Sequence, residues 1–275
     1  VSAMGLTVTS LIAPSILQAG EQDQADPTRV PGRAPSLYGS RAPTETAQRL
    51  TTATHSLTPH QVLHGIITPS ALHFERHHNG VPAINPDRHR LLIHGLVDRP
   101  LIFSMSDLMR FPSVTRTLFI ECSGNSGKEW KGPVGKTVQE THGLMNTSEW
   151  TGVPLMTVLA ESGIKPEAAW ILAEGSDAAA MTRSLPLAEV LKDGLLCYAQ
   201  NGEALRPEQG YPLRLVIPGW EGNTCIKWIR RLKVGIAPFM TREETSRYTD
   251  LMPDGTARQF TFVMEAKSVI TSPSG

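Results

Sequence analysis

The chain has 275 residues, of which 40% are apolar and 19% charged, a composition typical of a globular protein with one large or two small domains. Its 26 Lys and Arg residues balance its 26 Asp and Glu residues, so net charge predicts neither nucleic acid nor an anionic membrane as a partner. The sequence contains no stretch that predicts a membrane span. Its three cysteines form no Cys-x-x-Cys pair, which excludes a zinc ribbon, a thioredoxin motif and an attached c-type haem in this chain.

The N-terminal part differs in composition from the rest. Residues 1–20 carry no charged side chain and end in Leu17-Gln18-Ala19, a pattern typical of an export signal whose basic start is missing. A disordered apolar N-terminus is the alternative. Residues 21–58 are rich in Pro, Ser, Ala, Thr and charge, which predicts an extended or disordered segment. We therefore expect the compact domain to begin at residue 59.

Hydrophobic periodicity predicts short elements along the rest of the chain. The predicted strands cover residues 90–97, 117–121, 170–173, 195–199, 213–217 and 226–234. The predicted helices cover residues 106–110, 154–162 and 187–193, and glycine follows the last two. Asn201-Gly202 predicts a hairpin turn. Short helices scattered among many strands, without regular alternation, indicate a mixed, β-rich α+β fold rather than a doubly wound one.

Cys122 is the most informative single residue. It ends the apolar strand 117–121 and opens the turn Ser123-Gly124-Asn125-Ser126-Gly127, so its thiol is placed to bind a soft ligand. A buried structural thiol is the alternative. Cys197 lies within an apolar run and is typical of a small buried residue, whereas the surroundings of Cys225 favour no particular role.

Three further clusters bring polar donors together at residues 74–80, 209–214 and 222–228. They contain arginine, histidine and lysine side chains and glycine-containing turns, which supply the positive charge and N–H donors that a phosphate group needs. Each cluster alone is equally typical of a solvated loop. With Cys122, the set favours a cysteine-ligated cofactor that carries a phosphate.

Five strings in order give a resemblance over residues 64–271: 63–70 (LHGIITPS), 121–125 (ECSGN), 149–155 (EWTGVPL), 206–212 (RPEQGYP) and 248–255 (YTDLMPDG). They resemble the molybdenum-cofactor domain of the sulfite oxidase family, and within it the sulfane dehydrogenase subunits of bacterial Sox thiosulfate-oxidising systems. The resemblance implies a sulfite-oxidase-type molybdopterin-binding fold over residues 59–267. It also implies that residues 268–275 begin an immunoglobulin-like dimerisation domain, here cut short, so a homodimer is expected only through that domain.

The resemblance implies roles for individual residues. Cys122 matches the ligand of a molybdenum atom that one molybdopterin also holds. Arg76 and Tyr248 match residues on the substrate side, where Arg76 would orient the anionic product and Tyr248 would support an oxygen ligand. The implied cofactor contacts are Phe74, Arg76, His78, Asp177, Gln209, Arg214, Asn223, Thr224 and Lys227. Gln209 stands where animal sulfite oxidases carry a histidine, so the hydrogen bond is kept without a titratable group.

The resemblance also implies a reaction. A persulfide sulfur on a carrier protein would be oxidised to the sulfonate level with oxygen from water, in the periplasm, and a c-type cytochrome would take the electrons. Ser126 and Gly127 replace two arginines of animal sulfite oxidases, which weakens a clamp for free sulfite and favours a larger substrate. Alternatives are a sulfite dehydrogenase, a sulfoxide reductase, a cofactor-free binding module, or a thiol enzyme that pairs Cys122 with His78 or His142.

A basic segment offers a docking face for the cytochrome. Residues 227–247 contain six Lys or Arg residues against two Glu. Positive charge of this kind favours an acidic partner. The alternative is an ordinary basic surface strand.

Overall fold

The computed structural model describes residues 28–129, 132 and 137–274, so the predicted export signal at residues 1–20 lies outside the described residues. Contacts divide the chain into two units, Val1–Thr46 and Ala47–Gly275. Residues 28–46 of the first unit form turns and irregular structure. The second unit contains the end of the segment 21–58, which was predicted as extended or disordered. Leu50–Thr51 (β1) and His55–Leu57 (β2) are strands of a three-stranded sheet in this unit.

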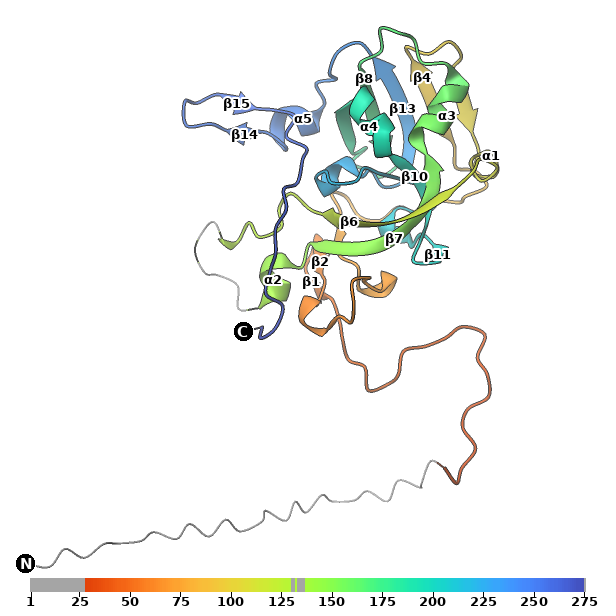
Figure 1. The fold of residues 1–275 in the computed structure, drawn as a ribbon, viewed down its shortest axis with the longest axis vertical. Coiled ribbons are helices and arrows are strands. Elements are labelled where there is room, and N and C mark those ends of the chain that lie inside the picture. Colours follow the sequence, from red (N-terminus) through yellow and green to blue (C-terminus); the bar gives the residue numbers. More distant parts are fainter. Residues whose placement is uncertain (1–27, 130–131, 133–136, 275) are drawn as a thin grey trace, which may run out of the picture. The chain divides into compact units, whose positions relative to one another are not determined.

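A five-stranded mixed sheet forms one side of the second unit (Figure 1). Its strands, in spatial order, are β5 (Leu101–Phe103), β4 (Leu91–Gly95), β13 (Ile229–Gly235), β8 (Trp170–Gly175) and β9 (Thr182–Pro186). Only the β13–β4 pair is parallel. The strand predicted from residue 226 begins at Ile229, because Gly222–Thr224 is a 3-10 turn (η5) and Trp228 adopts a left-handed φ of 52°.

A second, antiparallel sheet lies below it in Figure 1. Its spatial order is β11 (Glu203–Ala204), β10 (Leu195–Gln200), β7 (Met145–Pro154) and β6 (Val114–Glu121), and β12 (Arg214–Val216) also pairs with β10. The predicted hairpin at Asn201-Gly202 is confirmed, since both residues have positive φ and connect β10 to β11. Sequence analysis missed β7, whose buried residues include Asn146 and Ser148. Both are hydrogen-bonded inside the fold, to Phe74 N and Gln200 Nε2 respectively, so polar residues replace the expected apolar pattern.

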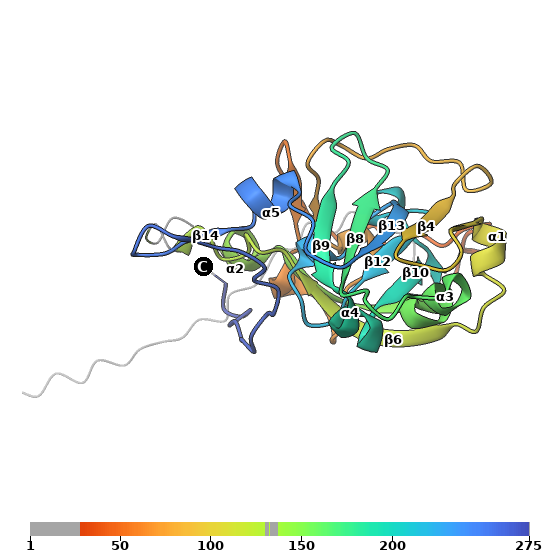
Figure 2. The ribbon, with the colours of Figure 1, turned by 90° about the horizontal axis from the view of Figure 1, so that it is seen from above.

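The small sheet joins β1, β2 and β3 (Glu75–Arg76), and a separate hairpin pairs β14 (Asp250–Leu251) with β15 (Ala257–Arg258). The helices are α1 (Met105–Leu108), α2 (Val138–His142), α3 (Leu155–Ser162), α4 (Leu187–Asp193) and α5 (Arg242–Ser246). Figure 2 shows α3 and α4 on the same side of the unit. Because α3 contacts β4 of the mixed sheet and β7 of the antiparallel sheet, it connects the two, whereas α4 packs on β8 and β9 of the mixed sheet. None of the helices in the described part of the chain has the length and apolar character that a membrane span requires.

Two apolar clusters hold these layers together. The larger one joins the mixed sheet to α3 and α4. The smaller one surrounds Trp150, which is fully buried, and includes Phe74, Cys197 and Cys225. Cys197 is fully buried, as predicted. The α+β prediction is confirmed, and the smaller cluster contributes Phe74 and Cys225 to the lining of a cleft.

Candidate functional site

A cleft of about 650 Å³, including its space open to solvent, lies where the ends of several strands converge. Every residue of the predicted site lines this cleft except Thr224: Phe74, Arg76, His78, Cys122, Asp177, Gln209, Arg214, Asn223, Lys227 and Tyr248. Thr224 is fully buried, and its hydroxyl donates to Glu221 O at 2.8 Å. It therefore shapes the η5 turn from behind rather than facing the cleft.

Backbone contacts fix the position of Cys122 at the end of β6. The Cys122 N–H donates to Leu144 O at 2.9 Å, and the Cys122 carbonyl accepts from Asn125 N at 2.9 Å. The η5 turn approaches this strand end closely, since a Cβ on Gly222 would lie only 2.7 Å from Glu121 O. Glycine at this position lets the loop that carries Asn223 pack beside the cysteine.

The Cys122 thiol is not activated by a base. Burial raises its pKa, although the Gly124 N–H and Arg76 oppose this effect, so the free thiol is protonated at neutral pH. His78 lines the same cleft, but its Nε2 lies 3.2 Å from the Tyr248 hydroxyl. His142 lines a different cavity. These positions argue against a thiol enzyme, whereas metal binding would deprotonate the sulfur directly.

Arg214 is the most deeply placed cation of the cleft wall. Gln209 Nε2 donates to Phe74 O at 2.9 Å, and the Gln209 side-chain oxygen accepts from Arg214 Nη1 at 3.1 Å. Arg214 Nε and Asn223 Oδ1 are buried, and neither has a hydrogen-bond partner among the described residues. Burying an unsatisfied polar atom costs about 1–3 kcal/mol, so both atoms fit a ligand that offers an acceptor and a donor.

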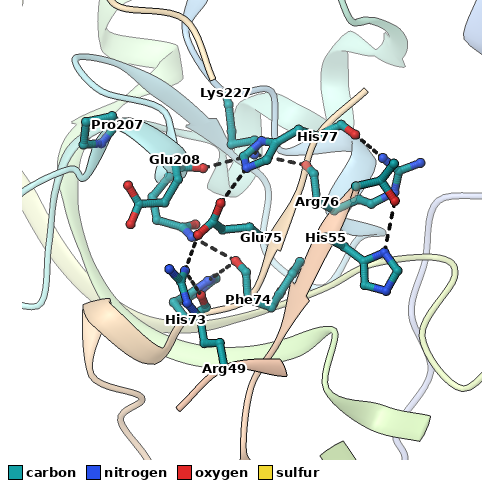
Figure 3. Close-up of polar contacts among 12 residues, drawn as sticks. Arg49, His55, His73, Phe74, Glu75, Arg76, His77, Pro207, Glu208 and Lys227 are labelled. Atoms are coloured by element: carbon teal, nitrogen blue, oxygen red, sulfur yellow. Dashed lines mark hydrogen bonds and ion pairs between the residues drawn. The ribbon is translucent and has the colours of Figure 1, made fainter. Parts of the chain in front are cut away.

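Lys227 lies at the centre of a hydrogen-bond network with Arg76, His77 and Glu208, called the Lys227 node (Figure 3). Its Nζ donates to Arg76 O and Glu208 O, both at 3.1 Å, and to His77 Nδ1 at 2.7 Å. Burial, reinforced by the nearby Arg214 charge, holds the Lys227 pKa well below its ordinary value. An ammonium has three N–H donors, and all three have protein acceptors here. Lys227 thus offers the cleft no free donor, and a bound anion would favour its charged form against this pKa shift.

The node continues to the surface through His77, which sequence analysis placed in the polar cluster 74–80 but did not name as a site residue. His77 Nε2 lies 2.8 Å from Glu75 Oε2, and Glu75 also pairs with Arg49 (Figure 3). Burial lowers the His77 pKa, partly offset by the Glu75 hydrogen bond, so His77 is neutral and can accept from Lys227. Its position beside His78 in the sequence was the available signal.

Two residues from loops complete the cleft. Asp177 lies in the turn between β8 and β9, where its Oδ1 accepts from Met181 N at 3.0 Å. Tyr248 follows α5, and burial raises its pKa to about 12. The phenol is therefore protonated at neutral pH and is able to donate a hydrogen bond into the cleft. Other lining residues that sequence analysis did not assign are Met181, Gly222, Cys225, Ile226 and Trp228.

The predicted basic docking segment is partly neutralised. Arg230 Nε lies 2.9 Å from Glu174 Oε1, and Arg231 pairs with the other oxygen of the same carboxylate. Arg242 pairs with Glu243. Lys227 is in the cleft wall rather than on the surface. The segment thus offers much less free positive charge than its sequence indicated.

Comparison with known proteins gives one consistent result. The family model described as an oxidoreductase molybdopterin binding domain matches residues 78–242. The crystal structure of the sulfane dehydrogenase SoxCD from Paracoccus pantotrophus is 46% identical and aligns with a TM-score of 0.79, over 96% of this chain and 68% of that chain. NADH nitrate reductases of Ulva prolifera and Volvox carteri are 35% and 37% identical over 187 residues, which is 62% of this chain. The chain matches 21% of the length of each of these reductases.

Proposed function

The chain belongs to the family of molybdopterin-binding oxidoreductases, and from this premise we propose that it oxidises a sulfane sulfur carried on the cysteine of a partner protein. One observation carries the proposal. The Cys122 thiol shares a single cleft with the buried Arg214, the half-buried Lys227 and the Arg76 guanidinium. A soft ligand beside anion-binding groups suits a metal held by a phosphate-bearing cofactor.

The residues of the cleft fit a molybdenum–molybdopterin group with one pterin per metal. Cys122 would hold the metal, while Arg214 Nε and Asn223 Oδ1 would complete their hydrogen bonds on the pterin or its phosphate. Lys227 would offset the phosphate charge. When bound, the group supplies a metal that exchanges electrons in pairs and oxygen with water. No haem or flavin is needed within this chain.

The chain's own residues would bind and orient the substrate. The Arg76 charge acts on both sides of the cleft. Burial raises the pKa of Cys122 and of Tyr248, and the positive charge of Arg76 opposes the rise in each. It would attract the anionic persulfide and the sulfonate product. The protonated Tyr248 phenol would donate to an oxygen at the reacting centre, while the Nε2–H tautomer of His78, 3.2 Å away, would donate to the phenol oxygen.

The turn after Cys122 supports a large substrate. Ser126 and Gly127 occupy the places of two arginines in animal sulfite oxidases, and neither lines the cleft. A clamp of two charge-assisted hydrogen bonds contributes about 2–3 kcal/mol, so its loss weakens the binding of free sulfite about a hundredfold. A carrier protein brings binding energy from its own surface and does not need that clamp.

The remaining parts of the proposal follow from the family resemblance. The electrons would pass to a c-type cytochrome subunit, and the reaction would take place in the periplasm as part of thiosulfate oxidation. A homodimer through an immunoglobulin-like domain beginning near residue 268 belongs to the same proposal.

The test combines metal analysis with steady-state kinetics. We expect about one molybdenum per chain and no haem or flavin. With a cytochrome acceptor, the persulfidated carrier should be oxidised much more efficiently than free sulfite. Replacing Ser126 and Gly127 by Arg should improve sulfite binding and slow the carrier reaction. Sulfite oxidation as efficient as that of the carrier would instead assign a sulfite dehydrogenase, and protein without molybdenum would support a binding module.

A further inference from the structure

Arg183 on β9 is a fully buried cation outside the cleft. Its side chain has no exposed surface, and its Nε lies 2.7 Å from Glu244 Oε1 on α5. Its Nη2 donates to Glu244 Oε2 at 3.3 Å. The same carboxylate accepts from Ser184 N at 2.9 Å. This pair therefore attaches the segment that precedes Tyr248 to the mixed sheet.

Arg183 also contacts the ring of Tyr248 itself. Its Cζ lies 4.7 Å from the Tyr248 ring centroid and 5.3 Å from that of Phe262. Both distances are typical of a cation–π contact. Tyr248 lines the cleft and Arg183 does not, so the guanidinium supports the phenol from behind.

A second chain of contacts leads from Arg183 to the cysteine turn. Arg183 Nη1 has no hydrogen-bond partner but lies 3.9 Å from Glu221 Oε2. Glu221 Oε2 accepts from Asn223 Nδ2 at 2.7 Å, and the same amide reaches Ser123 Oγ at 3.2 Å. Ser123 directly follows Cys122. One guanidinium thus lies between the tyrosine and the cysteine sides of the cleft.

Anchoring α5 does not by itself require this arginine. Thr182 Oγ1 already donates to Glu243 Oε2 at 2.8 Å, which joins β9 to α5 without a buried cation. A buried ion pair is often replaceable by apolar groups with little change in stability. A fully buried guanidinium that leaves one nitrogen unsatisfied therefore indicates a role beyond cohesion of the fold.

We propose that Arg183 is a positioning residue, which holds the Tyr248 phenol and the Cys122 turn in one fixed arrangement across the cleft. The inference rests on the proposed function, in which Tyr248 contacts the reacting centre. A displacement of such a group by about 1 Å can lower a rate a hundredfold. Arg183 would thus act on turnover more than on substrate affinity.

The test replaces both partners so that no unpaired charge is left buried. In Arg183→Met/Glu244→Gln the glutamine oxygen still accepts from Ser184 N. Arg183→Lys keeps the charge but loses the planar fork that pairs with carboxylate and stacks on rings. Arg116→Met is the matched control, because Arg116 forms an exposed ion pair with Asp193 at 2.8 Å. The measurements are thermal unfolding, kcat and KM of the loaded enzyme, and NMR of protein with labelled tyrosines.

The chain has four tyrosines, and Tyr248→Phe assigns the Tyr248 signal. We expect the double variant to unfold near the wild-type temperature and to show only the Tyr248 signal shifted. Its kcat should fall by about tenfold or more, whereas its KM should stay nearly unchanged. Arg183→Lys should recover part of kcat. An unshifted Tyr248 signal with wild-type kcat per folded molecule would overturn the proposal.

The NMR measurement separates this inference from the proposed function, since it needs no turnover. If Tyr248→Phe retains full activity, the catalytic part of the proposed function fails. In that case an unshifted Tyr248 signal in the double variant would still reject the positioning role, whereas a shifted signal would support it.

Discussion

The cleft wall and the exposed part of β13 use the same kinds of cationic residues in opposite ways. Arg230 and Arg231 have side chains 49% and 36% exposed, and both pair with Glu174. Such surface pairs contribute about 0–1 kcal/mol each. Lys227, three residues before Arg230, is half-buried and donates to two carbonyls and an imidazole instead of a carboxylate.

The difference shows what burial does to a charge. A guanidinium such as Arg214, taken out of water with no carboxylate among the described residues to pair with it, loses several kcal/mol of hydration. A fold keeps such a residue where an anion compensates the loss. The exposed cations of β13 need no ligand, because water solvates them and both pair with Glu174. Position in the sequence does not distinguish the two groups.

The largest expected effect separates Cys122 from the buried cysteines. Cys122→Ser should abolish turnover while leaving the fold in place, because an alkoxide is a harder and more basic ligand than a thiolate. Cys197→Ala is the control, since Cys197 is fully buried beneath the cleft and should change stability but not turnover per folded molecule. Kinetics and molybdenum content measure both. Wild-type turnover in Cys122→Ser would remove this residue from the mechanism.

The next largest effect concerns Arg214, whose replacement should weaken cofactor binding without destabilising the apoprotein. Arg214→Met should weaken cofactor retention about a hundredfold, because a charge-assisted hydrogen bond of about 2–3 kcal/mol is lost. Apoprotein stability should stay equal or rise, since an unpaired buried cation is removed. Arg116→Met, in an exposed pair, should change neither. A variant that retains its cofactor as the wild type does would show that Arg214 is only structural.

A smaller effect depends on pH. Burial lowers the pKa of His73, beneath the cleft, from 6.5 to about 3. Below pH 6.5, His73 is protonated in the unfolded chain but stays neutral in the folded protein. The free energy of unfolding therefore decreases as the pH falls from 6.5 to about 3. The slope is about 1.4 kcal/mol per pH unit, or roughly 2 kcal/mol at pH 5.

Denaturant unfolding of the apoprotein across this range measures the slope. His73→Phe should lose the contribution, whereas the exposed His64→Asn should keep the wild-type slope. A His73→Phe slope equal to that of the wild type would mean that other histidines account for the acid sensitivity.

The smallest effect is expected on β13. Replacing Arg230 by Gln should change stability by about 1 kcal/mol or less, because Arg230 is the more exposed of the two arginines and Arg231 still pairs with the buried Glu174. Affinity for a cytochrome should change only slightly, since Glu174 already neutralises part of this charge. Titration at low salt, where screening is weak, is the sensitive measurement. A tenfold or larger loss of affinity for the cytochrome would support the basic docking face predicted from the sequence.

The sequence predicted local elements well and long-range contacts less well. Helices α3 and α4 were predicted nearly to the residue, because apolar spacing and a following glycine are local signals. Strand β7 was missed, since its buried positions include Asn146 and Ser148, whose hydrogen-bond partners lie far away in the chain. No local pattern encodes such partners.

For the candidate site, too, residues carried by sequence motifs were easier to predict than residues whose role depends on distant partners. The site residues could be predicted because the resemblance carries their positions, and the cleft gathers all of them except Thr224. Arg183 was missed, and His77 was placed in a polar cluster without a role of its own, because the importance of both depends on burial and on partners in distant elements. The β13 cations were overestimated for the converse reason, since Glu174 is more than fifty residues away in the sequence.

The Lys227 node also limits which amino acid its position accepts. Its three acceptors, Arg76 O, Glu208 O and His77 Nδ1, equal the three donors of an ammonium. An arginine would carry five N–H groups into the same buried space, where the surplus donors would have no acceptor. A change that is conservative in charge is therefore not conservative here. The count of hydrogen atoms, and not the charge alone, makes lysine the residue that fits.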